Sequence, residues 1–124
     1  MRDFRELLVW QKAKELVKAV YSLTASFPDK ERFGLVSQMQ RAAVSVMTNI
    51  AEGHGRVSDG DFARFLSMAI GSSNELESLM IVSREMSVGL AQGYEPVEGL
   101  QDEVKKMLYG LRSSLAERPA ARNR

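Results

Sequence analysis

The sequence predicts an all-α protein, an antiparallel up-down-up-down four-helix bundle. Apolar residues recur at helical spacing in four stretches of the chain, and short segments rich in Gly, Pro, Ser or Asp separate these stretches. One stretch, residues 33–51, carries a single formal charge, at Arg41. Because the connections are short, successive helices are expected to pack as antiparallel neighbours.

The first helix is predicted over residues 3–25, and the Phe27-Pro28-Asp29 segment ends it and turns the chain. Its apolar positions recur at helical spacing: Val9, Ala13, Leu16, Val17, Val20 and Leu23.

The second helix is predicted to begin between residues 29 and 35 and to end at Gly53, a residue common at helix C-termini. Its apolar residues cover more than one face: Leu35, Val36, Met39, Ala42, Ala43, Val46, Met47 and Ile50. A surface helix normally shows one apolar stripe. Because a 124-residue chain has one small core, we expect other copies of the chain to cover part of this helix.

The third helix is predicted to begin at Ser58, which forms a capping box with Asp61, and to continue to Met86. Gly71 lies in its middle, where we expect a neighbouring backbone to approach closely.

Residues 88–94 are predicted to form a loop, and Pro96 suits the first turn of the fourth helix. That helix has a narrow apolar seam of Val97, Leu100, Val104, Met107, Leu111 and Leu115. Pro119 ends it, so residues 1–117 are predicted to form the bundle and residues 118–124 a disordered C-terminal tail.

Composition excludes several classes of site. The chain has no cysteine, which excludes disulfides, zinc–cysteine sites and thiol nucleophiles. Its single histidine, His54, cannot supply the paired Glu-x-x-His motifs of a di-iron bundle. We therefore expect no metal and no cofactor. The N-terminus has no signal-peptide run and no segment is apolar enough to span a bilayer, so a cytoplasmic location is expected.

Basic residues are in excess near both ends of the chain, although the formal net charge is only +1. Residues 1–25 carry a net charge of +2, and residues 112–124 a net charge of +3. A ring of identical subunits would multiply these small excesses. The candidate nucleic-acid-binding residues are Arg2, Arg5, Lys12, Lys14, Lys18, Arg112, Arg118, Arg122 and Arg124.

A second set of polar residues belongs to the second and third helices: Gln38, Arg41, Asn49, Glu52 and Glu75. Leaving such groups buried without partners would cost about 1–3 kcal/mol each. We therefore expect them to form hydrogen bonds across helices or subunits, with Arg41 paired to Glu75 or Glu52. Exposure of Arg41 and Glu52 to water is the alternative. General acid–base catalysis by Glu52 and Glu75 is a weaker hypothesis because no catalytic constellation accompanies them, and we predict no enzymatic activity.

The chain resembles a known family through motifs that stand in order along it. These are Val9-Trp10-Gln11-Lys12-Ala13, Phe33-Gly34-Leu35, Gln38, Arg41-Ala42-Ala43, Ser45, Asn49-Ile50-Ala51-Glu52-Gly53, Phe65-Leu66, Ala69, Gly71-Ser72 and Glu75-Leu76. They are similar to the bacterial four-helix-bundle proteins of the large-subunit ribosomal RNA intervening sequence protein family. The resemblance extends over residues 4–115, and the Asn49–Gly53 run is its most specific part.

The resemblance implies an antiparallel four-helix protomer that assembles into a ring, a homopentamer, and it implies an association with RNA. Gln40 departs from the family pattern, in which an arginine commonly precedes the residue matching Arg41. The expectation that this helix contacts RNA through two adjacent arginines is therefore weaker for this chain. A distantly similar protein accompanies the reverse transcriptase of diversity-generating retroelements and is a basic ring that binds nucleic acid. This chain is far less basic.

Together these observations predict a non-enzymatic homo-oligomeric assembly or adaptor protein, a pentamer by the resemblance. Its partners would be further copies of itself and another protein. The alternative is binding of structured RNA linked to ribosomal RNA intervening sequences.

Overall fold

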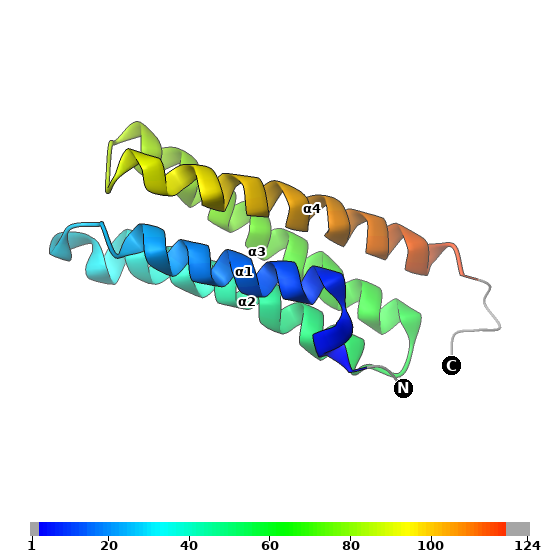
Figure 1. The fold of residues 1–124 in the computed structure, drawn as a ribbon. Helices are drawn as coiled ribbons and strands as arrows, with labels where there is room; N and C mark the ends of the chain where they lie inside the picture. The colour runs from blue at the N-terminus through cyan, green and yellow to red at the C-terminus, as the bar shows by residue number, and fades with distance from the viewer. Residues whose placement is uncertain (1–2, 119–124) are drawn as a thin grey trace.

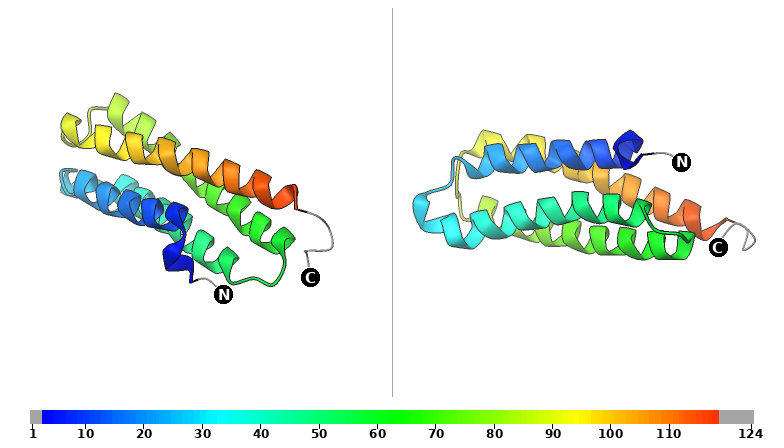
Figure 2. Two further views of the ribbon diagram at one scale, coloured as in Figure 1. Left: turned by 45° about the vertical axis from the view of Figure 1, so that its right-hand side comes forward. Right: turned by 90° about the horizontal axis from the view of Figure 1, so that it is seen from below.

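The computed structural model describes residues 3–118, and within them it contains four α-helices and no strand (Figure 1). These helices are α1 (Leu8–Thr24), α2 (Ser37–His54), α3 (Asp59–Glu85) and α4 (Tyr94–Ala116). α2 packs against α1 and α3, and α4 packs against the same two helices. The predicted all-α, four-helix fold is confirmed. Figure 2 shows the α1–α2 and α3–α4 connections together at one end of the bundle, with the α2–α3 connection at the other.

The core lies between the four helices and draws on all of them. Its fully buried members include Leu16, Val46, Leu76 and Leu108, one from each helix. Each predicted apolar stripe faces this core, because burying the stripe is what stabilises an amphipathic helix. α1 buries every predicted position except Val17, which is half-buried.

The first helix is shorter than predicted because the chain bends at Leu7. The 3-10 turn η1 (Phe4–Glu6) precedes α1, and Leu7 between them has extended backbone angles (φ −73°, ψ 125°). Asp3 caps η1 by accepting a hydrogen bond from the Arg5 backbone amide at 2.8 Å. The Gln11 side chain donates to the Arg5 carbonyl oxygen at 2.9 Å and so fastens η1 to α1.

The start of the second helix is irregular. The 3-10 turn η2 (Asp29–Glu31) leads into a wide turn, η3 (Arg32–Val36), in which Gly34 has non-helical backbone angles (φ −111°, ψ −106°). Regular α-helix begins only at Ser37, and it continues to His54, one residue beyond the predicted end at Gly53. Phe33, beside the kink in η3, lies on the surface and is 88% exposed.

The contacts between α2 and α3 fix how the two helices are aligned. Ser45 Oγ lies 2.8 Å from Ser72 Oγ. Further along α2, a Cβ added to Gly53 would lie 2.6 Å from Phe65 Cβ. Each step forward along α2 is therefore matched by a step back along α3. Glycine is required at position 53 because α3 approaches so closely that a side chain would not fit. This requirement is stronger than the preference for glycine at a helix C-terminus, on which the sequence prediction rested.

Gly71 has no such neighbour. A Cβ added there would meet nothing within 4 Å in the described chain, and Gly71 is exposed. The expected close approach of a neighbouring backbone is therefore absent within residues 3–118.

α3 begins as predicted, because the Ser58 side chain accepts a hydrogen bond from the Asp61 backbone amide at 3.1 Å. The fourth helix begins at Tyr94, two residues before Pro96, after the 3-10 turn η4 (Ala91–Gly93). Tyr94 is buried, and its hydroxyl is hydrogen-bonded to the Val88 carbonyl oxygen (2.7 Å) and to Ser83 Oγ (3.0 Å).

α4 ends at Ala116, and Arg118 follows it with an ordered side-chain contact to Asp59. The rest of the predicted tail, residues 119–124, lies outside the described residues. None of the described helices combines the length and the apolar character that crossing a membrane requires.

Candidate interaction surfaces

Residues 3–118 contain no group of three or more His, Cys, Asp or Glu side chains that could hold a metal ion. His54 closes α2, and its ring packs edge-on against Phe62, with 5.9 Å between ring centroids. Glu52 and Glu75 do not share a site. Gly53, beside Glu52, faces Phe65, and Glu75 is ten residues further along α3, about 15 Å at the rise of an α-helix. The structure therefore does not bring together the two carboxylates considered for acid–base catalysis.

The predicted polar set lies at the surface of the single chain. Gln38, Arg41, Glu52 and Glu75 are exposed. Asn49 is half-buried, and its amide donates to the Ser45 carbonyl oxygen at 2.9 Å and to Ser45 Oγ at 3.1 Å, beside the bond that joins α2 to α3.

Arg41 forms no ion pair with Glu52 or Glu75 within residues 3–118, so the expected pairing is not made within one chain, and pairing across subunits stays a prediction. Glu52 instead pairs with Arg56, one turn further along, at 3.2 Å. Exposure to water, the alternative, describes Arg41 and Glu52 in one chain.

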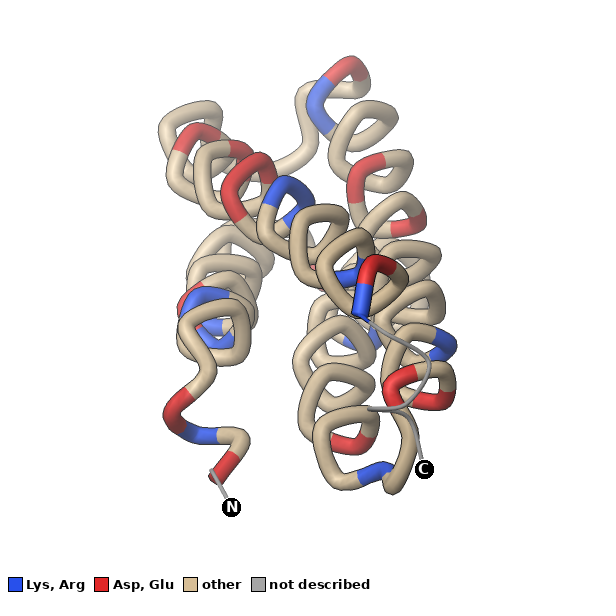
Figure 3. The backbone as a smooth tube through the Cα atoms, turned by 90° about the vertical axis from the view of Figure 1, so that its right-hand side faces the viewer, with Lys and Arg blue, Asp and Glu red and all other residues tan. Residues whose placement is uncertain are grey.

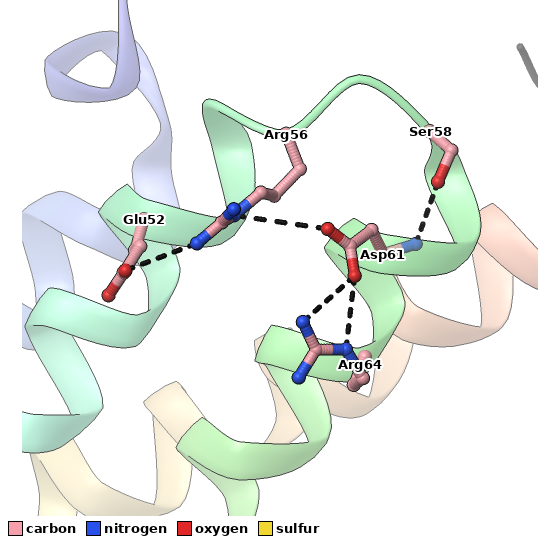
Figure 4. A network of polar contacts seen from close by, with 5 residues as sticks. All are labelled: Glu52, Arg56, Ser58, Asp61 and Arg64. Carbon is pink, nitrogen blue, oxygen red and sulfur yellow. Dashed lines mark hydrogen bonds and ion pairs between the residues drawn. The ribbon is translucent and has the colours of Figure 1, made fainter.

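The α2–α3 turn carries a network of charges that the sequence did not single out (Figure 4). Arg56 contacts Glu52 at 3.2 Å and Asp61 at 3.9 Å, and Arg64 contacts Asp61 at 3.0 Å. Both guanidinium groups also lie over the Phe65 ring, at 4.6 and 4.8 Å from its centroid. The Asp61 carboxylate thus neutralises two arginines, while its backbone amide donates the capping hydrogen bond to Ser58 Oγ. This network stabilises the turn and leaves no free cationic patch.

Three of the six candidate nucleic-acid-binding residues that the structure describes form ion pairs with carboxylates. Arg5 pairs with Asp3, and Arg118 donates to Asp59 at 2.9 Å. The hydrogen bonds and the charge of Arg5 hold the pKa of Asp3 at about 2. Lys12 lies 3.6 Å from Glu103. Figure 3 shows basic and acidic residues interspersed at the end of the bundle where α1 begins and α4 ends.

The remaining basic candidates are freer. Arg112 donates to Ser67 Oγ at 3.1 Å and stacks on Tyr109, and the Lys14 ammonium lies 5.3 Å from the centroid of the Trp10 ring. Neither Lys14 nor Lys18 has a carboxylate partner within residues 3–118. Arg2, Arg122 and Arg124 lie outside the described residues.

An apolar groove opens between α1 and the beginning of α2. We define this α1–α2 groove by the residues that line it: Tyr21, Arg32, Phe33, Val36, Ser37, Gln40, Arg41 and Val44. Phe33 and Tyr21 are exposed, and Val36 and Val44 are half-buried. The charged residues among those that line the groove are Arg32 and Arg41, and the Arg32 guanidinium lies 5.6 Å from the centroid of the Phe33 ring.

A second candidate surface, of mixed apolar and charged character, follows the outer side of α3. We define this α3 ridge by five exposed residues at helical spacing, Glu75, Ser78, Val82, Glu85 and Met86. Met86 is 62% exposed and Val82 41% exposed. The ridge therefore combines exposed apolar side chains with two carboxylates.

A third hollow lies between α3 and α4, but three of the four charged residues that line it already form ion pairs. Lys105 donates to Glu77 at 2.6 Å, which raises the pKa of Lys105, and Arg84 pairs with Glu98. This hollow offers Asp102 as its one carboxylate without a partner in the described part of the chain.

Comparison with known proteins assigns the chain to a family. The family model described as 23S rRNA-intervening sequence protein matches residues 5–110. The chain belongs to this family. This intervening sequence protein is also similar in fold to the crystal structure of a protein of unknown function from the S23 ribosomal protein family of Bacteroides thetaiotaomicron. The TM-score is 0.75 at 22% sequence identity, over 85% of this chain and 98% of the other. A search of curated proteins found no match to this chain.

Two surfaces of this intervening sequence protein were not predicted from its sequence. The groove was missed because Phe33 lies in an apolar stretch, and only the kink at Gly34 turns it outward. The ridge had a visible signal: Val82 and Met86 widen the apolar face of the third helix beyond the width that one core can bury.

Proposed function

We propose that this chain is a non-enzymatic assembly or adaptor protein that forms a homo-oligomeric ring. Its protomer is the antiparallel up-down-up-down bundle, five copies make the ring that the family resemblance implies, and a cytoplasmic location belongs to the same proposal. The observation that carries it is Phe33, a residue that is 88% exposed at the rim of an apolar groove. Burying such a side chain contributes about 1.5–3 kcal/mol, which favours a partner surface over water.

The outward side of α2 supports assembly because it carries few charges. Between Arg41 and Glu52, its exposed and half-buried positions are occupied by uncharged residues, namely Val44, Ser45, Met47, Thr48, Asn49 and Ala51. Small neutral side chains allow another helix to approach closely and have little hydration to lose. Thr48 is exposed and the other five are half-buried in one chain, so this side of α2 offers a neighbouring copy an uncharged, partly accessible surface.

The test is the mass of the assembly in solution, measured by light scattering after size exclusion. The unmodified chain is expected to have a mass several times that of the 13.8 kDa protomer. Phe33→Asp should shift it toward the protomer, because a carboxylate in the apolar interface is costly to desolvate. Val57→Asp is the matched control, since Val57 is 77% exposed on the α2–α3 turn, away from the groove. Equal masses for the two variants would contradict the proposed interface.

Binding of structured RNA is the second candidate function. The family description supports it, as do Lys14 and Lys18, two lysines of α1 that lack a carboxylate partner within residues 3–118. A ring would repeat this pair once per subunit and so add weak phosphate contacts together.

RNA binding by this route must depend on salt. The logarithm of the association constant should fall linearly with the logarithm of salt concentration. Lys14→Gln with Lys18→Gln should make this slope shallower by about one for each phosphate that the protein no longer neutralises. Lys106→Gln on α4 is the control for removal of one exposed charge. RNA binding whose affinity does not change with salt concentration would exclude these lysines as the RNA-binding residues. So would an equal loss of affinity in Lys106→Gln and in the variant with Lys14→Gln and Lys18→Gln.

A further inference from the structure

We infer that the α1–α2 groove of one copy receives the α3 ridge of the next copy, so that assembly is head-to-tail. This inference rests on the proposed homo-oligomer and specifies which two surfaces meet. The groove offers apolar side chains around Phe33, and the ridge offers the exposed side chains of Val82 and Met86.

The charges of the two surfaces are complementary. Arg32 and Arg41 line the groove, and Glu75 and Glu85 belong to the ridge. None of these four residues forms an ion pair within residues 3–118. Most other arginines in this part of the chain form an ion pair with a carboxylate, namely Arg5, Arg56, Arg64, Arg84 and Arg118. Opposite charges on facing surfaces align two partners and disfavour other arrangements.

The heights of these charges along the bundle also agree. The Ser45–Ser72 hydrogen bond sets the alignment of α2 with α3, so Arg41, one turn before Ser45, lies at the height of Glu75, one turn after Ser72. Arg32, in the α1–α2 connection, and Glu85, the last residue of α3, lie toward the same end of the bundle. A neighbour standing upright beside this copy would therefore meet Arg41 with Glu75, and Arg32 and Glu85 would lie toward the same end of the interface.

Two different surfaces that meet at one height are compatible with a ring. A heterologous contact closes into a ring when its rotation permits, and every copy in a ring stands at the same height. A two-fold contact between two grooves is disfavoured, because it would bring Arg32 and Arg41 of one copy against those of the other.

The absence of cysteine from the chain allows a direct cross-linking test. Ser37 lines the groove and Ser78 belongs to the ridge, at nearly the same height, and Ser→Cys changes little in size. Ser37→Cys and Ser78→Cys proteins, mixed and treated with a short bismaleimide, should give cross-linked dimers, and the double variant should give a ladder. Each single variant alone should give none. Ser114→Cys, on an exposed position of α4, replaces Ser78→Cys in the control mixture.

Charge reversal supplies the second measurement. R41E and E75R are each expected to raise the dissociation constant of assembly about tenfold or more, because like charges then face one another. The double variant R41E/E75R should recover most of that affinity, whereas K106E should change nothing.

Two failures can be told apart. If light scattering shows the assembled mass but Ser37→Cys cross-links to itself, or the mixture gives no dimer, the groove–ridge pairing is overturned and the homo-oligomer stands. If the unmodified chain has the protomer mass, both are overturned.

Discussion

Gly53 shows how a single position fixes the packing of two helices. Because a Cβ there would lie 2.6 Å from Phe65 Cβ, Gly53→Ala must push α2 and α3 apart. We expect a decrease of about 1–3 kcal/mol in the free energy of unfolding, measured by urea denaturation.

The matched control is Gly99→Ala on α4, where an added Cβ meets nothing within 4 Å. That variant should gain about 0.5–1 kcal/mol, because alanine loses less backbone entropy than glycine in a helix. Equal effects of the two substitutions would contradict the close approach at Gly53.

Single residues were the least predictable level of the structure. The Ser58 cap was predicted and is confirmed, because a cap depends on residues three apart in the chain. Within one chain the partner of Glu52 is Arg56, one turn further along, and not Arg41, which lies eleven residues earlier on the same helix. Spacing along a helix shows which residues share a face, and it cannot show which exposed charges meet.

At the scale of elements, hydrophobic periodicity predicted all four helices. It reports which side of a helix is buried, and α2 buries Met39, Val46 and Ile50 as that period requires. The ends of helices were less predictable. Periodicity does not report the non-helical backbone of Gly34, nor the early start of α4 at Tyr94, whose hydroxyl bonds Val88 and Ser83 across the α3–α4 connection.

The N-terminal end of α3 gives the prediction at this scale. Ser58→Ala removes the acceptor of the Asp61 amide and should lower the free energy of unfolding by about 1 kcal/mol. Amide hydrogen exchange should quicken first in the opening turn of α3, because removing the cap frays the helix end locally. Ser114→Ala, on an exposed part of α4, is the control. Unchanged exchange at the start of α3 would show that the cap contributes nothing.

At the scale of the whole molecule, the unusual property is an apolar surface spread over two sides of a small bundle. Phe33 and Tyr21 lie exposed at the groove, and Val82 and Met86 lie exposed on the ridge. The sequence predicted that α2 needs cover from other copies, since its apolar residues exceed one stripe. The sequence could not predict how the groove and the ridge are positioned relative to each other along the bundle. Their alignment depends on the contact between α2 and α3.

The mass of the unmodified chain in solution tests the proposed assembly most directly. Light scattering without RNA, at micromolar concentration and at both low and high salt, measures it. We predict one species at a fixed multiple of 13.8 kDa, five if the ring is the pentamer that the resemblance implies, held largely by apolar contacts and thus only weakly sensitive to salt. A species of 13.8 kDa under all of these conditions would contradict the proposed homo-oligomer.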